Sequence, residues 1–184
     1  MQAEEKWEAA QYHLELMRES MRNDNGKVFI FNLDAFLNTS RNITFVLKKE
    51  FNSNPKFQSW YCKKQIEMDK DELMKFFVKM RTISIKERSP ETHSVTTISV
   101  TDTGTATESV SLTLIHEDGT KEVFEPKLND AKEKQTIMKE TPVVRCNYYF
   151  FMDRIDNDVV SLCEQYLEKL FRLILEAKMI LESQ

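Results

Sequence analysis

Apolar residues recur at every third or fourth position over several stretches of this chain, a spacing typical of helices that bury one face. Along residues 3–22 these positions are Trp7, Ala10, Leu14, Met17 and Met21. A second stretch runs to Phe51, and we predict Asn32 as its N-cap. Asn54-Pro55 opens a third stretch, because proline suits the first turn of a helix. The apolar run at residues 28–31 fits a helix or a strand.

Two further stretches extend the helical pattern. The acidic residues 69–72 predict the start of a fourth helix that continues to about Glu87. The sequence leaves open whether this helix is separate from the third. The longest stripe predicts a helix over residues 157–181, with apolar positions at Val160, Cys163, Leu167, Leu170, Ile174, Ala177 and Leu181.

The pattern changes between the fourth and the last helix. From residue 92 to residue 113 apolar positions alternate with serine and threonine, which indicates strands. Asp118-Gly119 stands between two apolar pairs and predicts a hairpin. Residues 143–152, rich in valine, tyrosine and phenylalanine, favour a further strand.

These elements predict an α+β fold in a single domain over residues 1–184. The main part is a predominantly α-helical bundle of four to five helices, built from residues 1–88 and 156–184. An antiparallel β-meander insertion occupies about residues 92–152. Hydrophobic residues make up 41% of the chain and charged residues 30%, which are values typical of globular proteins.

The composition also bears on location. No apolar run reaches the roughly 20 residues that cross a bilayer, and no apolar leader begins the chain, so we expect no membrane partner. The three cysteines form no CxxC pair, a pattern that favours reduced thiols and a cytoplasmic location.

Charge is distributed unevenly. The chain has a net charge of −4, but residues 41–88 hold twelve Lys/Arg against six Asp/Glu, a net charge of +6. Such a segment favours contact with a polyanion. A simpler interpretation stays open, in which the lysines form the solvated faces of amphipathic helices: Lys63, Lys64, Lys70, Lys75, Lys79 and Lys86.

Common catalytic motifs are absent from the sequence. The three glycines form no phosphate-binding loop, and the three histidines have no zinc-ligand spacing, so we expect no cofactor and no metal. The acidic residues 69–72 fit either helix capping or a divalent ion, and capping is the simpler interpretation.

Three stretches resemble the HEPN superfamily of helical-bundle domains, many of which are ribonucleases of toxin and phage-defence systems. They are residues 33–41, the fourth helix ending at Arg81, and the long last helix. The superfamily's signature is an arginine, usually a polar residue, three to five variable residues and a histidine. Arg81 and Thr82 match this signature, but Lys86 stands where histidine belongs.

This departure changes the function that the resemblance implies. Lysine, with an ordinary pKa of about 10.4, stays protonated near neutral pH and is a poor general base. We therefore assign no catalytic residue, and Arg81 and Lys86 are the candidates for such a role. The same two residues, with Lys79 and Arg41, are expected to bind phosphate.

We therefore expect a catalytically degenerate HEPN-like module that is not an enzyme. It binds RNA or nucleotide phosphate in a defence or toxin–antitoxin context, and the resemblance implies a homodimer. Two alternatives stay open: a weak metal-independent ribonuclease that uses Arg81, and a non-enzymatic homodimeric protein-interaction scaffold.

Overall fold

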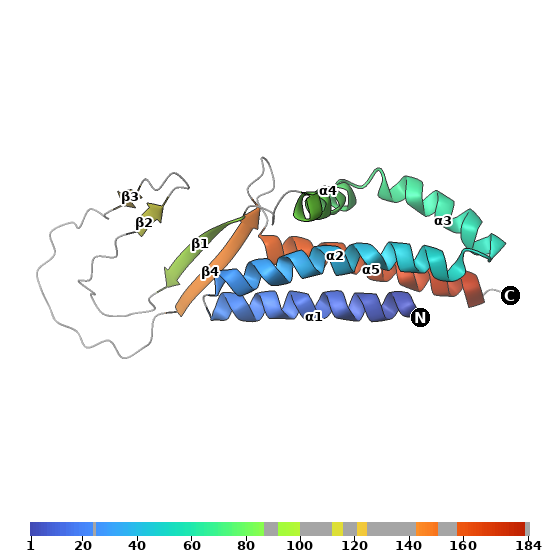
Figure 1. The fold of residues 1–184 in the computed structure, drawn as a ribbon, viewed down its shortest axis with the longest axis horizontal. Helices are drawn as coiled ribbons and strands as arrows, with labels where there is room; N and C mark the ends of the chain where they lie inside the picture. The colour runs from blue at the N-terminus through green and yellow to red at the C-terminus, as the bar shows by residue number, and fades with distance from the viewer. Residues whose placement is uncertain are drawn as a thin grey trace, which may run out of the picture. The chain divides into compact units, whose positions relative to one another are not determined.

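A computed structural model describes residues 1–23, 25–86, 92–99, 112–115, 121–124, 143–150 and 158–182. The helices among them are α1 (Gln2–Arg22), α2 (Gly26–Phe51), α3 (Pro55–Met68), α4 (Glu72–Lys86) and α5 (Val159–Glu182) (Figure 1). The strands are β1 (Thr92–Ser99), β2 (Leu112–Ile115), β3 (Lys121–Phe124) and β4 (Val143–Phe150). The described part of the chain is thus α+β and mainly helical, which confirms the predicted fold class.

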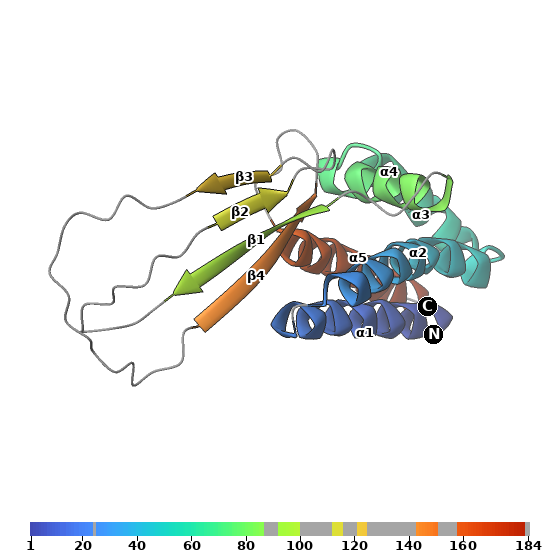
Figure 2. The same ribbon diagram turned by 60° about the vertical axis from the view of Figure 1, so that its left-hand side comes forward.

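The chain divides into two compact units. One consists of Met1–Thr97 with Arg145–Gln184 and holds the five described helices; the other is Ile98–Val144 and holds β2 and β3. In the smaller unit β2 pairs antiparallel with β3, as predicted for a hairpin (Figure 2). The predicted turn residues Asp118 and Gly119 lie outside the described residues. The single-domain organisation, with an insertion at about 92–152, stays a prediction.

The start of α2 differs from the sequence prediction. The N-cap is Asn25, whose side-chain oxygen accepts a hydrogen bond from the Val28 amide at 3.1 Å. Asn32 lies inside the helix, where its side-chain amide donates to the Val28 carbonyl at 2.9 Å. The prediction of Asn32 as N-cap is therefore wrong, because Asn25 already satisfies the first free amide of the helix. The ambiguous run 28–31 is helical.

α3 and α4 are separate helices, each with its own N-cap. Asn54 accepts hydrogen bonds from the amides of Lys56 and Phe57, at 3.0 and 3.1 Å, directly before Pro55. The Asp71 carboxylate accepts from the Met74 amide at 3.0 Å and so caps α4. Capping therefore accounts for this acidic residue.

β4 supplies aromatic residues to the helical core. The Tyr148 ring stacks on Phe29 of α2 with centroids 3.9 Å apart, and Phe150 meets Phe76 of α4 edge-on at 5.1 Å. A Cβ at Gly26 would lie only 2.9 Å from the Tyr148 hydroxyl oxygen, so glycine allows this close approach.

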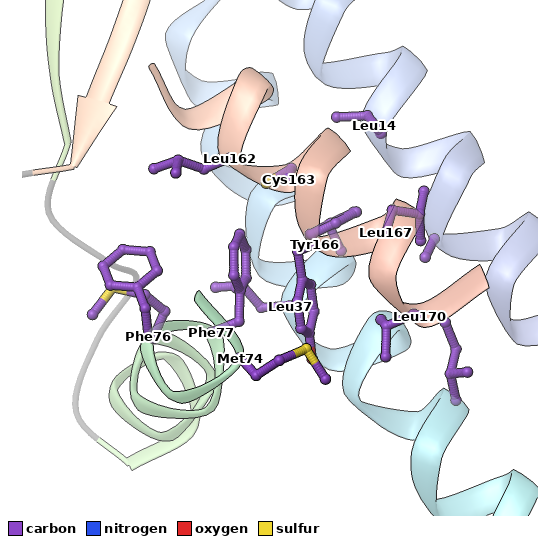
Figure 3. Packing of buried hydrophobic residues seen from close by; sticks show 14 of the residues in the cluster. Leu14, Leu37, Met74, Phe76, Phe77, Leu162, Cys163, Tyr166, Leu167 and Leu170 are labelled. Atoms are coloured by element: carbon purple, nitrogen blue, oxygen red, sulfur yellow. The ribbon is translucent and has the colours of Figure 1, made fainter. Parts of the chain in front are cut away.

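The centre of the helical core is an aromatic stack between α4 and α5. The Phe77 ring lies almost parallel to the Tyr166 ring, with centroids 4.2 Å apart (Figure 3). Phe77 also meets Phe36 of α2 edge-on, with centroids 6.2 Å apart. Phe36, Phe77 and Tyr166 are all buried. Such aromatic pairs contribute about 0.5–1.5 kcal/mol each beyond the burial of their area. They hold α4 against α2 and α5.

Replacing Phe77 with alanine is expected to lower the free energy of unfolding by about 3–5 kcal/mol, the usual cost of emptying a buried phenylalanine site. Urea denaturation followed by circular dichroism measures the change. Ile85→Ala is the control on the same helix, because its side chain is 51% exposed; we expect a change of about 0.5 kcal/mol or less for this surface position. If both variants lost the same free energy of unfolding, the packing of Phe77 would not be central to the stability of the helical core.

Tyr166 is expected to make the fold sensitive to alkali. Burial raises the pKa of Tyr166 to about 12, against the opposing attraction of the Arg41 guanidinium. In the unfolded chain the phenol ionises near pH 10. The stability that the buried neutral phenol contributes is therefore fully present below about pH 10 and is lost progressively as the pH rises to about 12. The loss amounts to about 3 kcal/mol, since each pKa unit corresponds to roughly 1.4 kcal/mol.

Urea denaturation at several pH values between 9 and 12 tests this prediction. Tyr166→Phe should flatten the decline in the free energy of unfolding, whereas Tyr12→Phe should not, because Tyr12 is exposed. An unchanged decline in Tyr166→Phe would show that other groups cause it.

Candidate anion-binding site

A cleft of about 350 Å³ opens between α2, α3 and α4. Two of the four predicted phosphate-binding residues, Arg41 of α2 and Lys79 of α4, line it together. Lys48 and Lys75 line it as well, although neither was predicted as a site residue. We refer to this site as the basic cleft.

Helical periodicity explains how these four cations come together. Arg41 and Lys48 are seven residues apart on α2, which places them about 20° apart around the helix axis. Lys75 and Lys79 are one turn apart on α4. Among the described residues that line the basic cleft, Asp69 is the single acidic one. Four cations therefore face one carboxylate.

The lysines of the basic cleft have no carboxylate partner in the part of the chain that the structure describes. The ion pairs formed there involve other lysines and arginines, and none includes Lys48, Lys75 or Lys79. Surface lysines gain little from ion pairs, but three unpaired cations beside an arginine create a positive local field.

A neighbouring cleft of about 240 Å³ shows the opposite arrangement, and we refer to it as the paired cleft. Lys64 Nζ lies 2.7 Å from Glu67 Oε2 and 2.8 Å from Glu176 Oε2. Lys169 Nζ lies 2.5 Å from Asp71 Oδ2. The pKa of Lys64 is raised by its hydrogen bonds to Glu176 and Glu67. Carboxylates thus neutralise these lysines, in contrast to the lysines of the basic cleft.

Arg41 is held in a fixed position on the wall of the basic cleft. Its guanidinium donates to Thr44 Oγ1 at 2.9 Å and lies over the Phe45 ring, 4.7 Å from the centroid. The Tyr61 hydroxyl donates to the Thr44 carbonyl at 3.1 Å. Burial raises the pKa of Tyr61, and Arg41 acts in the opposite direction. The phenol therefore stays protonated near neutral pH.

The other two predicted residues, Arg81 and Lys86, line neither cleft. Arg81 is turned about 120° around α4 from Lys75, and its Nε atom is buried without a hydrogen-bond partner among the described residues. Lys86 is exposed and lies on the same face of α4 as Lys75, but about 16 Å further along the axis. The structure thus brings Arg41 together with Lys79 and does not bring Arg81 or Lys86 into the basic cleft.

The missed residues carried a signal in the sequence. Lys75 precedes Lys79 by one turn, and Lys48 follows Arg41 by two turns, within the segment of net charge +6. The signature around Arg81 singles out Arg81, which is turned about 120° around α4 from Lys75 and does not line the basic cleft. Counting around the helix from the buried Phe77 places Lys75 on the same outward face as Lys79, which was already predicted.

Other candidate chemistry has a structural explanation where the residues are described. His13 Nδ1 lies 3.2 Å from Asn32 Oδ1, and the Trp7 indole donates to the Leu167 carbonyl at 3.1 Å. The side chains of His93 and His116 lie outside the description. Within the described residues, no three His, Cys, Asp or Glu side chains are grouped to hold a metal ion. No described helix combines the length and apolar character needed to span a bilayer.

The comparisons with known proteins give one match. Residues 11–145 match the family described as Bacteriophage lambda protein ea47. This span includes every residue that lines the basic cleft. Neither the curated proteins nor the solved structures contain a match to the chain.

Proposed function

The chain belongs to the bacteriophage lambda ea47 family, and we propose that it binds the phosphate groups of RNA or of a nucleotide without cleaving them. The observation that carries this proposal is the basic cleft, where, among the described residues, Arg41 and three lysines without ion-pair partners lie beside a single carboxylate. A setting in phage defence or in a toxin–antitoxin pair is part of the proposal, as is the homodimer expected from the HEPN-like resemblance.

Electrostatics supports an anionic ligand. Lys75 and Lys79 are like charges one turn apart, an arrangement that costs an isolated helix about 0.2–0.5 kcal/mol. A phosphate between them would remove this repulsion and accept hydrogen bonds from both ammonium groups. Arg41, from α2, offers a planar guanidinium that suits two phosphate oxygens.

The residues of the cleft favour binding over catalysis. No histidine is among the described residues that line it, and histidine is the side chain that most often acts as a general acid or base. The Tyr61 hydroxyl is occupied by the Thr44 carbonyl and is held in its protonated form by burial. Among the described residues that line the cleft, Asp69 is the single carboxylate that could accept the proton of a 2′-hydroxyl.

Replacing both Lys75 and Lys79 with alanine is expected to weaken binding of a fluorescently labelled single-stranded RNA, measured by anisotropy at 50 and 200 mM salt. Each phosphate contact contributes about 0.7 to the slope of log affinity against log salt. The double variant should therefore lower the steepness of this slope by about 1.4. Alanine favours helices, so the fold should be retained.

The matched control is the double variant Lys6→Ala and Lys63→Ala. It removes the same charge from exposed positions on α1 and α3 that line neither cleft. We expect its slope to stay close to that of the unchanged protein. If both double variants lose affinity equally, net charge and not the basic cleft governs binding.

Long incubation of the protein with structured and unstructured RNA in EDTA is expected to give no cleavage products on a denaturing gel. Cleavage that disappears in Arg81→Ala would instead support the weak metal-independent ribonuclease. Cleavage that persists in Arg81→Ala at the same rate would point to a contaminating nuclease, which a mock purification identifies.

A further inference from the structure

We infer that the basic cleft is a pocket for one unpaired nucleotide, with its base against the Arg41–Phe45 stack and its phosphate at Lys75 and Lys79. This inference rests on the proposed phosphate binding and adds the base as the group that determines selectivity. A free mononucleotide and a nucleotide within a single strand offer this same chemistry.

The cleft has apolar surface that phosphate binding alone does not need. Phe45 is 51% exposed and Val78 is 39% exposed, although both are large apolar residues. Met68 and Met74 also line the cleft. A flat base that covers these side chains removes apolar area from water, at about 25 cal/mol for each Å². Apolar surface beside unpaired cations therefore fits a ligand that is part aromatic and part anionic.

The wall formed by Arg41 and Phe45 has the properties of a stacking platform. The guanidinium already lies over the phenyl ring at 4.7 Å, and its bond to Thr44 limits its rotation. Bases that are unpaired stack on aromatic rings and on arginine planes in proteins that bind single strands. Each such stack contributes about 1–3 kcal/mol by alanine substitution.

Two polar residues of the cleft suit the edges of a nucleotide. Gln65 and Asp69 are four residues apart at the end of α3, and both are exposed. The Gln65 amide has donors and an acceptor, the combination that pairs with a base edge. A carboxylate in a site for phosphate alone would repel the ligand. Asp69 is explained if the ligand also presents donors, such as an exocyclic amine or a ribose hydroxyl.

The size and construction of the cleft favour an unpaired nucleotide over a duplex. Its volume of about 350 Å³ falls in the range of small-molecule pockets, about 300–1,000 Å³. The three chemical parts come from three helices: the stacking wall from α2, the polar residues from the end of α3, and the lysines from α4. A base in a duplex is stacked and paired, so it cannot enter such a pocket without unpairing.

The experiment compares Phe45→Ala with Phe31→Ala. Phe31 is the matched control because it is also exposed on α2 and lies beneath a cation, with Lys27 Nζ 5.7 Å from its centroid. The probes are a labelled single-stranded RNA, the same sequence as a duplex, adenosine monophosphate, inorganic polyphosphate and polyglutamate. Thermal melts followed by circular dichroism verify that both variants fold.

We expect the unchanged protein to bind the single strand more tightly than the duplex. Phe45→Ala should weaken binding of the single strand about 5- to 100-fold, the equivalent of one lost base stack. It should leave polyphosphate binding unchanged, and Phe31→Ala should change neither. If adenosine monophosphate binds measurably and Phe45→Ala abolishes this binding, the ligand is a free nucleotide. If the single strand binds but adenosine monophosphate does not, the ligand is a nucleotide within a strand.

The outcomes separate this inference from the proposed function. If Phe45→Ala changes no affinity, or the duplex binds as tightly as the single strand, the nucleotide pocket is wrong while phosphate binding stands. If polyphosphate and RNA both fail to bind the unchanged protein, both proposals fall. Tighter binding of polyglutamate than of RNA, lost in Phe45→Ala, would also overturn the inference in favour of an acidic peptide.

Discussion

The packing of Phe77 against Tyr166 is the interaction on which the site depends. Phe77 is buried between α2 and α5, and this burial fixes the rotation of α4 about its axis. Lys75 and Lys79 each lie about 160° around the helix from Phe77, so they point away from the core wherever Phe77 points into it. A core contact thereby determines which face of α4 presents cations beside Arg41. The orientation of the basic cleft is a consequence of packing.

The two neighbouring clefts differ in how their lysines are paired. Met68 and Met74 line both clefts and so form the partition between them. On one side, Lys64 and Lys169 tie α3 and the start of α4 to α5 through carboxylates. On the other side the lysines have no such partners among the described residues. Unpaired like charges do not stabilise a fold, so the basic cleft has the composition of a site kept for a ligand.

The sequence predicted the helices well because their burial follows the helical period, and it predicted the β2–β3 hairpin from its turn residues. It missed the start of α2 because two asparagines can each act as a cap, and only tertiary packing of the helix selects Asn25. The prediction did not include Tyr166 among the buried residues, because it considered only a narrow apolar stripe along the last helix. In the structure α5 buries a wider face, which includes Tyr166. A linear motif around Arg81 cannot show which way that side chain points, since this depends on how α4 docks.

The net charge of the protein bears on the proposed binding of an anion. With a total of −4, the chain as a whole does not attract polyanions at long range, and screening at physiological salt confines the field of the cleft to about 8 Å. An anion must therefore reach the cleft before the cations act on it, and charge alone gives little selectivity at that distance. For the proposed ligand, close contacts would have to supply the remaining selectivity, and the wall of Arg41 and Phe45 and the polar end of α3 are the groups that could make them. A small pocket with mixed chemistry is the arrangement that this charge balance favours over an extended basic surface.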